Sequence, residues 1–284
     1  MNNTLLIVGD PRGNHTLAAL KKYSPESITV WEHPDNHYTI HQLCDRINVI
    51  DDIDKLSDMR FNATIGNPPY QKGKNSNFYV EFIDVAARHT IEGGRVSLIV
   101  PNRFILPHTP ACKSILSQYK VSKMYVDVNK HFPGVGTKIG MFVGEVCSSG
   151  HTGLIDVELA DGNVIKWDGI EPIIPSRNPT LDGINEWQSL RVKNDYIIVN
   201  KQPTDHDDFV YVCRQWKTQK GVPYFDAEVG RNDNKRDGKY ILTEKPQELC
   251  NYLRSTDIAG KIHKLFGDQM NIWPFLWQYL PTCP

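Results

Sequence analysis

Short β-like apolar runs alternate with helical segments through the first half of the chain, and most of the runs stop at a polar residue or a turn. The runs are Leu5–Val8, Ser27–Trp31, Ile47–Ile50, Ala63–Gly66, Val96–Val100, Lys123–Asp127 and Gly140–Val146. Helices are predicted among them at Thr16–Tyr23 and Phe78–His89. Strands that alternate with helices form βαβ units, in which the strands run parallel. The sequence therefore predicts an α/β fold with a mostly parallel sheet.

Polar residues follow five of these runs, namely Asp10, Glu32, Asp51, Asn67 and Asn102. In an open α/β sheet, ligands bind beyond the carboxyl ends of the strands. One such residue by itself is usually a turn or helix-cap residue. Five in series indicate a polar rim at which a ligand binds.

The sequence pattern changes in the second half of the chain. After about residue 150 the alternation fades, and turn pairs such as Asp161-Gly162 and Asp237-Gly238 separate short β-like pieces. We expect a first domain over residues 1–150 and a smaller, mixed or β-rich domain over residues 151–284, which suits a chain of 284 residues.

Charge and cysteine usage narrow the classes of function. Residues 1–150 carry 16 Lys and Arg against 14 Asp and Glu, whereas residues 151–284 carry 16 against 19. DNA-binding surfaces are usually basic, so any phosphate contacts should be local and lie in the first half. The six cysteines form no C-x-x-C pair, no apolar run is long enough to span a membrane, and no signal peptide is evident. We expect reduced thiols, a cytoplasmic location and no membrane partner.

Metal binding is not expected from the histidines. His33, His37 and His41 recur at a spacing that aligns them on one helix face, but a surface stretch is the favoured interpretation. We predict no metal site.

The segment Asn67-Pro68-Pro69-Tyr70 carries the chemistry. Two prolines directly after a buried strand lock the backbone and remove two N–H donors. Asn67 adds a side-chain carbonyl and Tyr70 a flat aromatic face. A planar ring with an exocyclic amino group fits beside them, its two N–H bonds directed at the Asn67 side-chain oxygen and the Pro68 carbonyl.

Three stretches here resemble a known family: Gly66–Gln71, Asn77–Ile83 and Gly93–Phe104, with a weaker one at His131–Gly140. They are similar to the core of the S-adenosylmethionine-dependent adenine-N6 DNA methyltransferases, most of all the gamma-ordered class of restriction–modification systems and phages. The resemblance covers about residues 4–146. It implies a Rossmann-like class I methyltransferase fold and Asn67, Pro68, Pro69 and Tyr70 as catalytic residues. It also implies that the target adenine leaves the duplex.

The resemblance further implies S-adenosyl-L-methionine as cofactor. Its expected contacts are Asp10 and Gly13 in the loop after the first strand, Glu32 at the end of the second, and Asp51 (or Asp52) after the third. The loop Asp10–His15 is one residue shorter than the family pattern and keeps one glycine where two are usual.

Double-stranded DNA is the implied partner, and a separate restriction nuclease is compatible with it. Phe132 is a candidate to cover the flipped base, and phosphate contacts are expected at Lys72, Lys74, Arg103 and Lys138. The second domain is assigned to target recognition by its position, with basic and aromatic residues at Arg214–Lys217 and Arg231–Arg236.

Two alternatives stay open at this point. One is an amino methyltransferase that acts on RNA guanine or protein glutamine, because Asn-Pro-Pro-Tyr occurs in these enzymes too. The other is a methyltransferase-like DNA-binding protein without activity, which the short Asp10–His15 loop favours.

Overall fold

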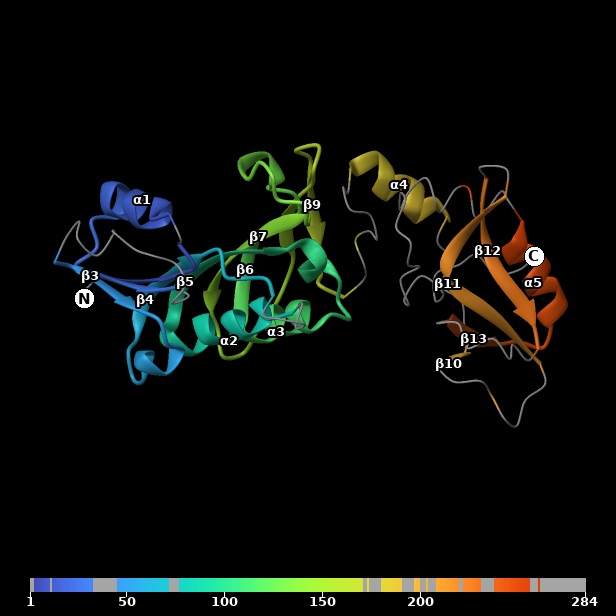
Figure 1. The fold of residues 1–284 in the computed structure, drawn as a ribbon, viewed down its shortest axis with the longest axis horizontal. Helices are drawn as coiled ribbons and strands as arrows, with labels where there is room; N and C mark the ends of the chain where they lie inside the picture. The colour runs from blue at the N-terminus through green and yellow to red at the C-terminus, as the bar shows by residue number, and fades with distance from the viewer. Residues whose placement is uncertain are drawn as a thin grey trace. The chain divides into compact units, whose positions relative to one another are not determined.

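The computed structural model describes residues 3–10, 12–32, 45–71, 77–170, 173, 180–190, 197–199, 203, 208–219, 222–230, 238–255 and 260. The chain divides into two compact units, Met1–Ile173 and Ile174–Pro284 (Figure 1). None of the helices in the described part of the chain is long and apolar enough to cross a membrane.

The first unit is built on one sheet of nine strands. Their bounds are β1 (Thr4–Val8), β2 (Ser27–Trp31), β3 (Ile47–Ile50), β4 (Phe61–Gly66), β5 (Thr90–Pro101), β6 (Tyr119–Tyr125), β7 (Ile139–Val146), β8 (Ile155–Glu158) and β9 (Val164–Trp167). The order across the sheet is β3-β2-β1-β4-β5-β7-β6-β8-β9. Strands β1 to β5 pair in parallel, and β7 lies antiparallel between β5 and β6. The predicted Rossmann-like α/β fold with a mostly parallel sheet is confirmed.

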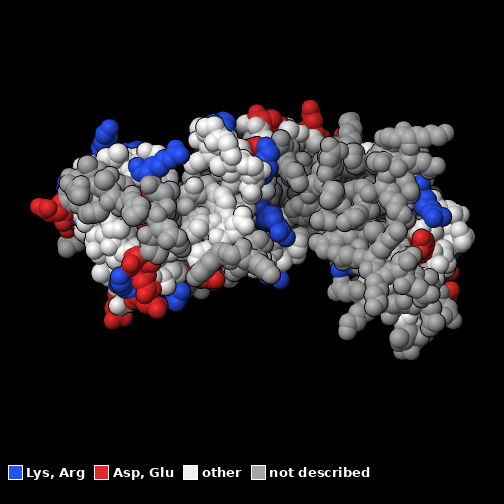
Figure 2. Space-filling view, viewed as in Figure 1, with Lys and Arg blue, Asp and Glu red and all other residues white. Residues whose placement is uncertain are grey.

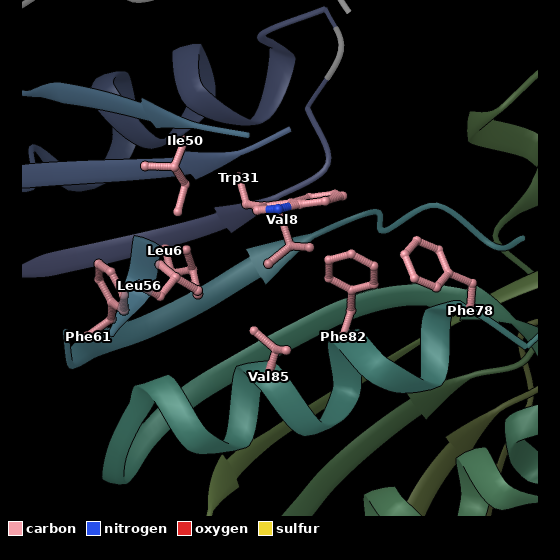
Figure 3. Close-up of a cluster of buried hydrophobic side chains, with 9 residues drawn as sticks. All are labelled: Leu6, Val8, Trp31, Ile50, Leu56, Phe61, Phe78, Phe82 and Val85. Carbon is pink, nitrogen blue, oxygen red and sulfur yellow. The ribbon is translucent and has the colours of Figure 1, made fainter. Parts of the chain in front are cut away.

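Helices cover both faces of this sheet, because alternate residues of the buried strands point to opposite sides. The helices are α1 (Asn14–Tyr23), α2 (Tyr79–His89) and α3 (Pro110–Gln118), with 3₁₀ turns η2 (Ile53–Leu56), η3 (Asn102–Ile105) and η4 (Asn129–His131). Leu5 and Ile7 pack on the side of α1, together with Ala19. Leu6 and Val8 pack on the side of α2, in the cluster that Figure 3 shows.

Aromatic side chains at the start of α2 pack against the strands. Phe78, Phe82 and Val85 recur at helical spacing and meet the strand residues Val8 and Trp31. The rings of Trp31 and Phe82 lie 4.5 Å apart, and those of Phe78 and Phe82 lie 5.2 Å apart (Figure 3). This packing holds the carboxyl ends of β1 and β2 against the start of α2.

The structure differs from the sequence prediction at three places in this unit. Strand β5 begins at Thr90, directly after α2, and runs through Gly93-Gly94, whereas the sequence predicted a strand only over Val96–Val100. Helix α3 was not predicted, although Thr109 caps it and Pro110 occupies its first turn. The first unit also extends beyond the expected boundary at residue 150, because β8 and β9 continue its sheet.

The second unit contains a separate antiparallel sheet of four strands in the order β10-β13-β11-β12. Its elements are α4 (Leu181–Leu190), β10 (Ile197–Val199), β11 (Phe209–Gln219), β12 (Val222–Val229), β13 (Gly238–Leu242) and α5 (Pro246–Arg254). Helix α5 lies beside β12 (Figure 1). It buries Leu249 and Leu253, and the Cys250 thiol donates to the Ala227 carbonyl. The expected smaller, β-rich second part of the chain is confirmed.

Candidate active site

The candidate site lies where the strand order of the first sheet reverses. Strand β1 pairs with β2 on one side and with β4 on the other, so the carboxyl ends of β1 and β4 flank the switch point of the topology. Open α/β sheets bind their ligands at this point. Val8 pairs with Gly66, which places the residues that follow, Gly9 and Asn67, side by side.

Gly9 allows the two strand ends to meet. Its φ of 70° lies in the left-handed region, and a Cβ added to it would lie 2.4 Å from the Asn67 carbonyl oxygen. The amide N–H of Asn67 donates to the Val8 carbonyl at 2.9 Å, and that of Gly9 donates to the Trp31 carbonyl at 3.0 Å. The backbone of Asn67 is therefore attached to β1, and only glycine fits at position 9.

The side chain of Asn67 is held by its neighbour in the motif. The Tyr70 hydroxyl donates to Asn67 Oδ1 at 2.6 Å. Burial raises the pKa of Tyr70 to about 12, while the hydrogen bond to Asn67 acts in the opposite direction. Tyr70 is therefore a neutral donor near neutral pH. A carbonyl oxygen has two lone pairs, so Asn67 Oδ1 keeps one acceptor position.

The structure brings Tyr70 and Phe132 to one apolar cluster. Its buried members are Ile99, Val128 and Ile139, and the partly buried side chains packed against it are Tyr70, Tyr125, Phe132 and Met141. These residues come from the ends of β5 and β6, the start of β7, and the segments that follow β4 and β6. Two aromatic side chains, 62 residues apart in the sequence numbering, thus share one surface beside Asn67.

The residues predicted to contact phosphates differ in their exposure and in their partners. Arg103 is exposed in η3, directly after β5, and its carbonyl accepts from the Thr109 hydroxyl. Lys138 is partly buried, and its Nζ lies 3.5 Å from Asp127 Oδ2. Lys72 and Lys74 lie outside the described residues. In the described part of the surface shown in Figure 2, Lys and Arg form separate patches and no continuous basic field.

The loop after β1 is organised by Asp10. Its carboxylate accepts from the amide of His15 at 3.1 Å, the amide of Thr16 at 2.8 Å and the hydroxyl of Thr16 at 2.7 Å. The carboxylate thus caps the first turn of α1, where free amide groups need acceptors. Gly13 precedes the helix with a φ of 70°, and its amide donates to the Asp10 carbonyl.

Two buried acidic residues, Asp10 and Glu32, follow β1 and β2 and are joined by one hydrogen bond. Asp10 and Glu32 are 2% and 5% exposed, and the Asp10 amide donates to Glu32 Oε2 at 2.6 Å. The preceding residue, Trp31, is also buried, and its indole N–H has no hydrogen-bond partner among the described residues. A buried donor without an acceptor is rare, so this strand end is suited to a ligand that offers oxygen or nitrogen acceptors.

The acids after β3 have local partners. Asp51 is exposed and pairs with Lys55 at 2.5 Å, and this contact lowers the pKa of the Asp51 carboxyl. The Asp52 side chain accepts from the Asp54 amide and caps η2.

Several residues named in the sequence analysis lie outside the described part of the chain. The histidines at 33, 37 and 41 and the segment Arg231–Arg236 lie outside the described residues, and the side chains of Arg214–Lys217 do so as well. Within the described ranges, no group of three or more His, Cys, Asp or Glu side chains is arranged to hold a metal ion.

Sequence reasoning missed Trp31 and Asn129, which the structure places next to residues of the site. Trp31 reads as an ordinary apolar residue of a strand, but it directly precedes Glu32 and its indole N–H has no partner among the described residues. Asn129 follows the sixth predicted strand by two residues, in the same way as the five polar residues follow theirs, and its side chain bonds to the loop that carries Phe132.

Much of the first unit matches a known protein family. Residues 15–132 match the Eco57I restriction-modification methylase family. The resemblance to restriction–modification methyltransferases that the motifs indicate is thereby confirmed over this region. The methylase match contains Glu32, the Asn67–Tyr70 motif and Phe132, whereas Asp10, Gly13 and Lys138 lie beyond its ends. No curated protein matches the chain.

Several solved structures are similar at low sequence identity. The type I restriction-modification methyltransferase subunit from Streptococcus thermophilus is 13% identical, with a TM-score of 0.44 over 59% of this chain and 46% of that one. The type IIG restriction endonuclease BpuSI is 13% identical, with a TM-score of 0.46 over 72% of this chain and 34% of that one. A predicted O-methyltransferase from Agrobacterium tumefaciens is 16% identical, with a TM-score of 0.40 over 54% and 78%.

The chain thus spans less than half of either restriction-modification protein. Because the three TM-scores lie below 0.5, the fold class rests on the strand order and pairing of the first sheet.

Proposed function

We propose that this chain transfers a methyl group from S-adenosylmethionine to the N6 amino group of an adenine at specific sites in double-stranded DNA. One observation carries the proposal. Asn67 Oδ1 is held by Tyr70 at the switch point of a methylase fold, beside an apolar cluster that also includes Phe132. An acceptor next to two aromatic side chains suits a planar base with an exocyclic amino group.

The proposed reaction follows from the poor nucleophilicity of adenine N6, whose lone pair is delocalised into the ring. Asn67 Oδ1 and the Pro68 carbonyl would accept hydrogen bonds from the two N6–H groups, which localises the lone pair and directs it toward the methyl donor. As the bond between N6 and the methyl group forms, the bond from the methyl group to the donor's sulfur would break, and one N6 proton would pass to solvent. Tyr70 would stack on the base and Phe132 would cover its other face. Since the amino group is paired within a duplex, the base has to leave the helix.

S-adenosylmethionine supplies an electrophilic methyl group when bound. The residues at the ends of β1 and β2 fit such a ligand, because Trp31 carries a buried donor that lacks an acceptor. Glu32 would bind the ribose hydroxyls and Gly13 would allow close approach of the backbone. Asp51 would meet the adenine amino group, and Asp10 would act mainly through the loop that its carboxylate organises.

The duplex would contact the first unit near Arg103 and Lys138, together with Lys72 and Lys74. The second unit, from residue 174 onward, is proposed to recognise the target sequence. A separate restriction nuclease is the partner that this activity would require for restriction, and the cytoplasm is the proposed location.

The test is modification mapping of genomic DNA from cells that express the chain. We expect N6-methyladenine at one defined sequence motif, and none in cells that express Asn67→Ala. The Asn67→Ala protein should bind S-adenosylmethionine in calorimetry as the wild type does, because the residue faces the substrate base. Unmodified DNA together with labelled RNA or protein would favour the other amino methyltransferases. Absence of cofactor binding at millimolar concentration would favour an inactive DNA-binding protein.

A further inference from the structure

The segment from Asn129 to Ile139 joins β6 to β7 and carries Phe132 and Lys138, two of the residues proposed to contact DNA. Residues 133–137 are exposed. Cβ atoms added at Gly134 and Gly136 would meet nothing within 4 Å. Since no described neighbour supports the outer side of this loop at its glycines, its conformation has to be maintained from within.

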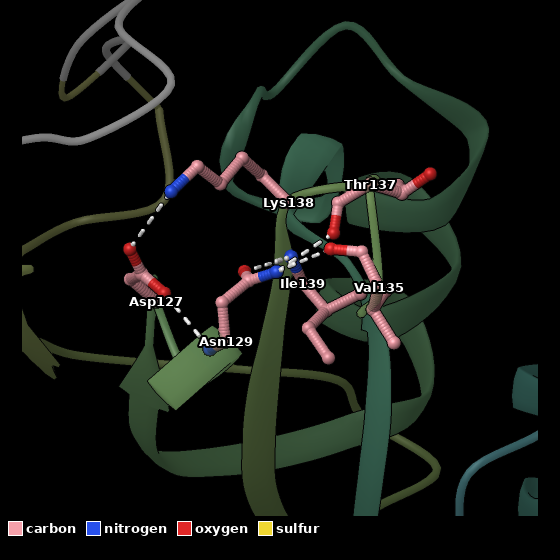
Figure 4. Close-up of polar contacts among 6 residues, drawn as sticks. All are labelled: Asp127, Asn129, Val135, Thr137, Lys138 and Ile139. Carbon is pink, nitrogen blue, oxygen red and sulfur yellow. Dashed lines mark hydrogen bonds and ion pairs between the residues drawn. The ribbon is translucent and has the colours of Figure 1, made fainter. Parts of the chain in front are cut away.

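Asn129 provides that internal support. Its Nδ2 donates to the Thr137 carbonyl at 2.9 Å and to the Val135 carbonyl at 3.4 Å, and its Oδ1 accepts from the Ile139 amide at 2.9 Å. Figure 4 shows that the amide group lies inside the turn of the loop and reaches its far strand. One side chain therefore connects the start of the loop to three positions near its end.

Asp127 extends the same contact network to Lys138. Its Oδ1 accepts from the Asn129 amide at 2.9 Å, and its Oδ2 lies 3.5 Å from Lys138 Nζ (Figure 4). The Lys138 carbonyl accepts from the Asn102 amide at 3.0 Å, which ties this end of the loop to the end of β5. Asn129 and Asp127 thus link the loop to the end of β6, the strand that precedes it.

The other end of the loop reaches the aromatic side of the site. The Phe132 amide donates to the Asn129 carbonyl at 2.8 Å, and the Phe132 side chain packs against the cluster that Tyr70 also contacts. The backbone of Asn129 thus holds the start of the loop next to Phe132, while its side chain holds the end of the loop at residues 135, 137 and 139.

We infer that Asn129 is a positioning residue for base capture, which holds Phe132 opposite Tyr70 and Lys138 beside Asp127. The inference rests on the proposed function. Asn129 touches neither Tyr70 nor the methyl donor in this assignment and acts through the loop. Its two hydrogen bonds to the Val135 and Thr137 carbonyls are exposed, so water replaces them in a variant; the bond from the Ile139 amide is partly buried, and the loss of overall stability should be about that of one hydrogen bond.

The experiment compares three variants of the full chain, Asn129→Ala, Asn129→Asp and Asn62→Ala, on a duplex carrying the mapped target site. Asn62 is a matched control, because its Oδ1 also accepts a hydrogen bond from a backbone amide, that of Thr4, at 2.9 Å. Asn62 lies near the start of β4, at the end of the strand opposite to Asn67. Single-turnover methylation, the KM for S-adenosylmethionine and the fluorescence of 2-aminopurine at the target position are measured.

We expect Asn129→Ala to slow single-turnover methylation about 10- to 100-fold, as an error in position of the order of 1 Å does. The 2-aminopurine signal should fall, while the KM for S-adenosylmethionine stays within about twofold of the wild type because the loop is remote from β1 and β2. Asn129→Asp should be at least as slow, since it keeps the acceptor for Ile139 and places a carboxylate oxygen against the Thr137 carbonyl. Asn62→Ala should match the wild type in all three measurements.

The outcomes separate this inference from the proposed function. If the wild-type chain methylates no adenine, the proposed function fails and the inference fails with it. If the wild type is active and Asn129→Ala behaves as Asn62→Ala does, only the inference is overturned. A rise in the KM for S-adenosylmethionine that accounts for the whole loss of activity, with normal 2-aminopurine fluorescence, also overturns it.

Discussion

Replacement of Gly9 by alanine tests how closely the ends of β1 and β4 have to approach. The new Cβ would lie 2.4 Å from the Asn67 carbonyl oxygen, about 1 Å short of ordinary van der Waals contact at 3.4 Å. Backbone lies on both sides of this contact, so neither partner can rotate away. The substitution therefore has to move the backbone of the Asn67–Tyr70 motif.

Two terms contribute to the expected loss of stability. A non-glycine residue at a φ of 70° costs about 1–2 kcal/mol. Overpacking adds about 1–3 kcal/mol, so the free energy of unfolding should fall by about 2–5 kcal/mol. A 1 Å displacement of Asn67 should also lower the rate of methyl transfer by about 100-fold.

Gly93→Ala is the matched control. Gly93 has a φ of 72°, yet a Cβ added to it would meet nothing within 4 Å, and it lies near the start of β5, away from the carboxyl ends of the strands. This variant should show the cost of φ alone, about 1–2 kcal/mol, with wild-type activity.

Urea unfolding of the full chain, with hydrogen exchange in the peptides of β1 and β4, measures the stability of the first unit. Single-turnover methylation of the mapped site measures the rate. Equal losses of stability for Gly9→Ala and Gly93→Ala, or full activity of Gly9→Ala, would refute the claim that these strand ends are in steric contact.

Four further predictions concern three side chains of the first unit, Tyr70, Asp10 and Cys112. Tyr70→Phe removes the donor to Asn67 Oδ1 and should lower kcat about 2- to 10-fold at an unchanged KM for S-adenosylmethionine, as the loss of one hydrogen bond does; an unchanged kcat would argue against a fixed Asn67 side chain. Because burial raises the pKa of Tyr70 from 10.0 to about 12, the folded state holds this proton more tightly, so its contribution to stability is present below pH 10 and lost as the pH rises toward 12; urea titrations should show a flatter decline in that window for Tyr70→Phe. Asp10→Ala leaves the first turn of α1 uncapped and should cost about 1–2 kcal/mol in urea unfolding, with no loss expected if solvent caps the helix equally well. Burial raises the pKa of the Cys112 thiol to about 12, so iodoacetamide at neutral pH should label Cys112 only after unfolding, and rapid labelling of the native chain would contradict its burial.

Much of the first sheet follows from local sequence patterns. Runs of four or five mostly apolar residues that stop at an acidic residue predict strands with the observed bounds, as at β2 and β3. Strand β5 shows the limit of this reasoning. The sequence predicts a strand only over Val96–Val100, but pairing with β4 and β7 extends it from Arg95 to Pro101, and Thr90 pairs with Phe61 beyond an irregularity that contains Gly93 at a φ of 72°.

The chemistry of the site is divided in the same way. The Asn-Pro-Pro-Tyr motif after a buried strand is a local feature, so the sequence by itself determined the acceptor, the aromatic face and the kind of fold that presents them. The Asp10 carboxylate, by contrast, reads as a ligand of the rim in the sequence and is a helix cap in the structure. Local composition does not distinguish these roles, because both require an acid after a strand.

Only the tertiary structure decided which distant residues share the site. It packs Phe132 and Tyr70 against one cluster, seats Gly9 against Asn67, and places the amide of Asn129 inside the loop that carries Phe132. These contacts join residues from β1, β4, β6 and β7. They depend on the order in which the strands pair, and that order is set by burial of both faces of the sheet over the whole unit rather than by the residues on either side of each strand.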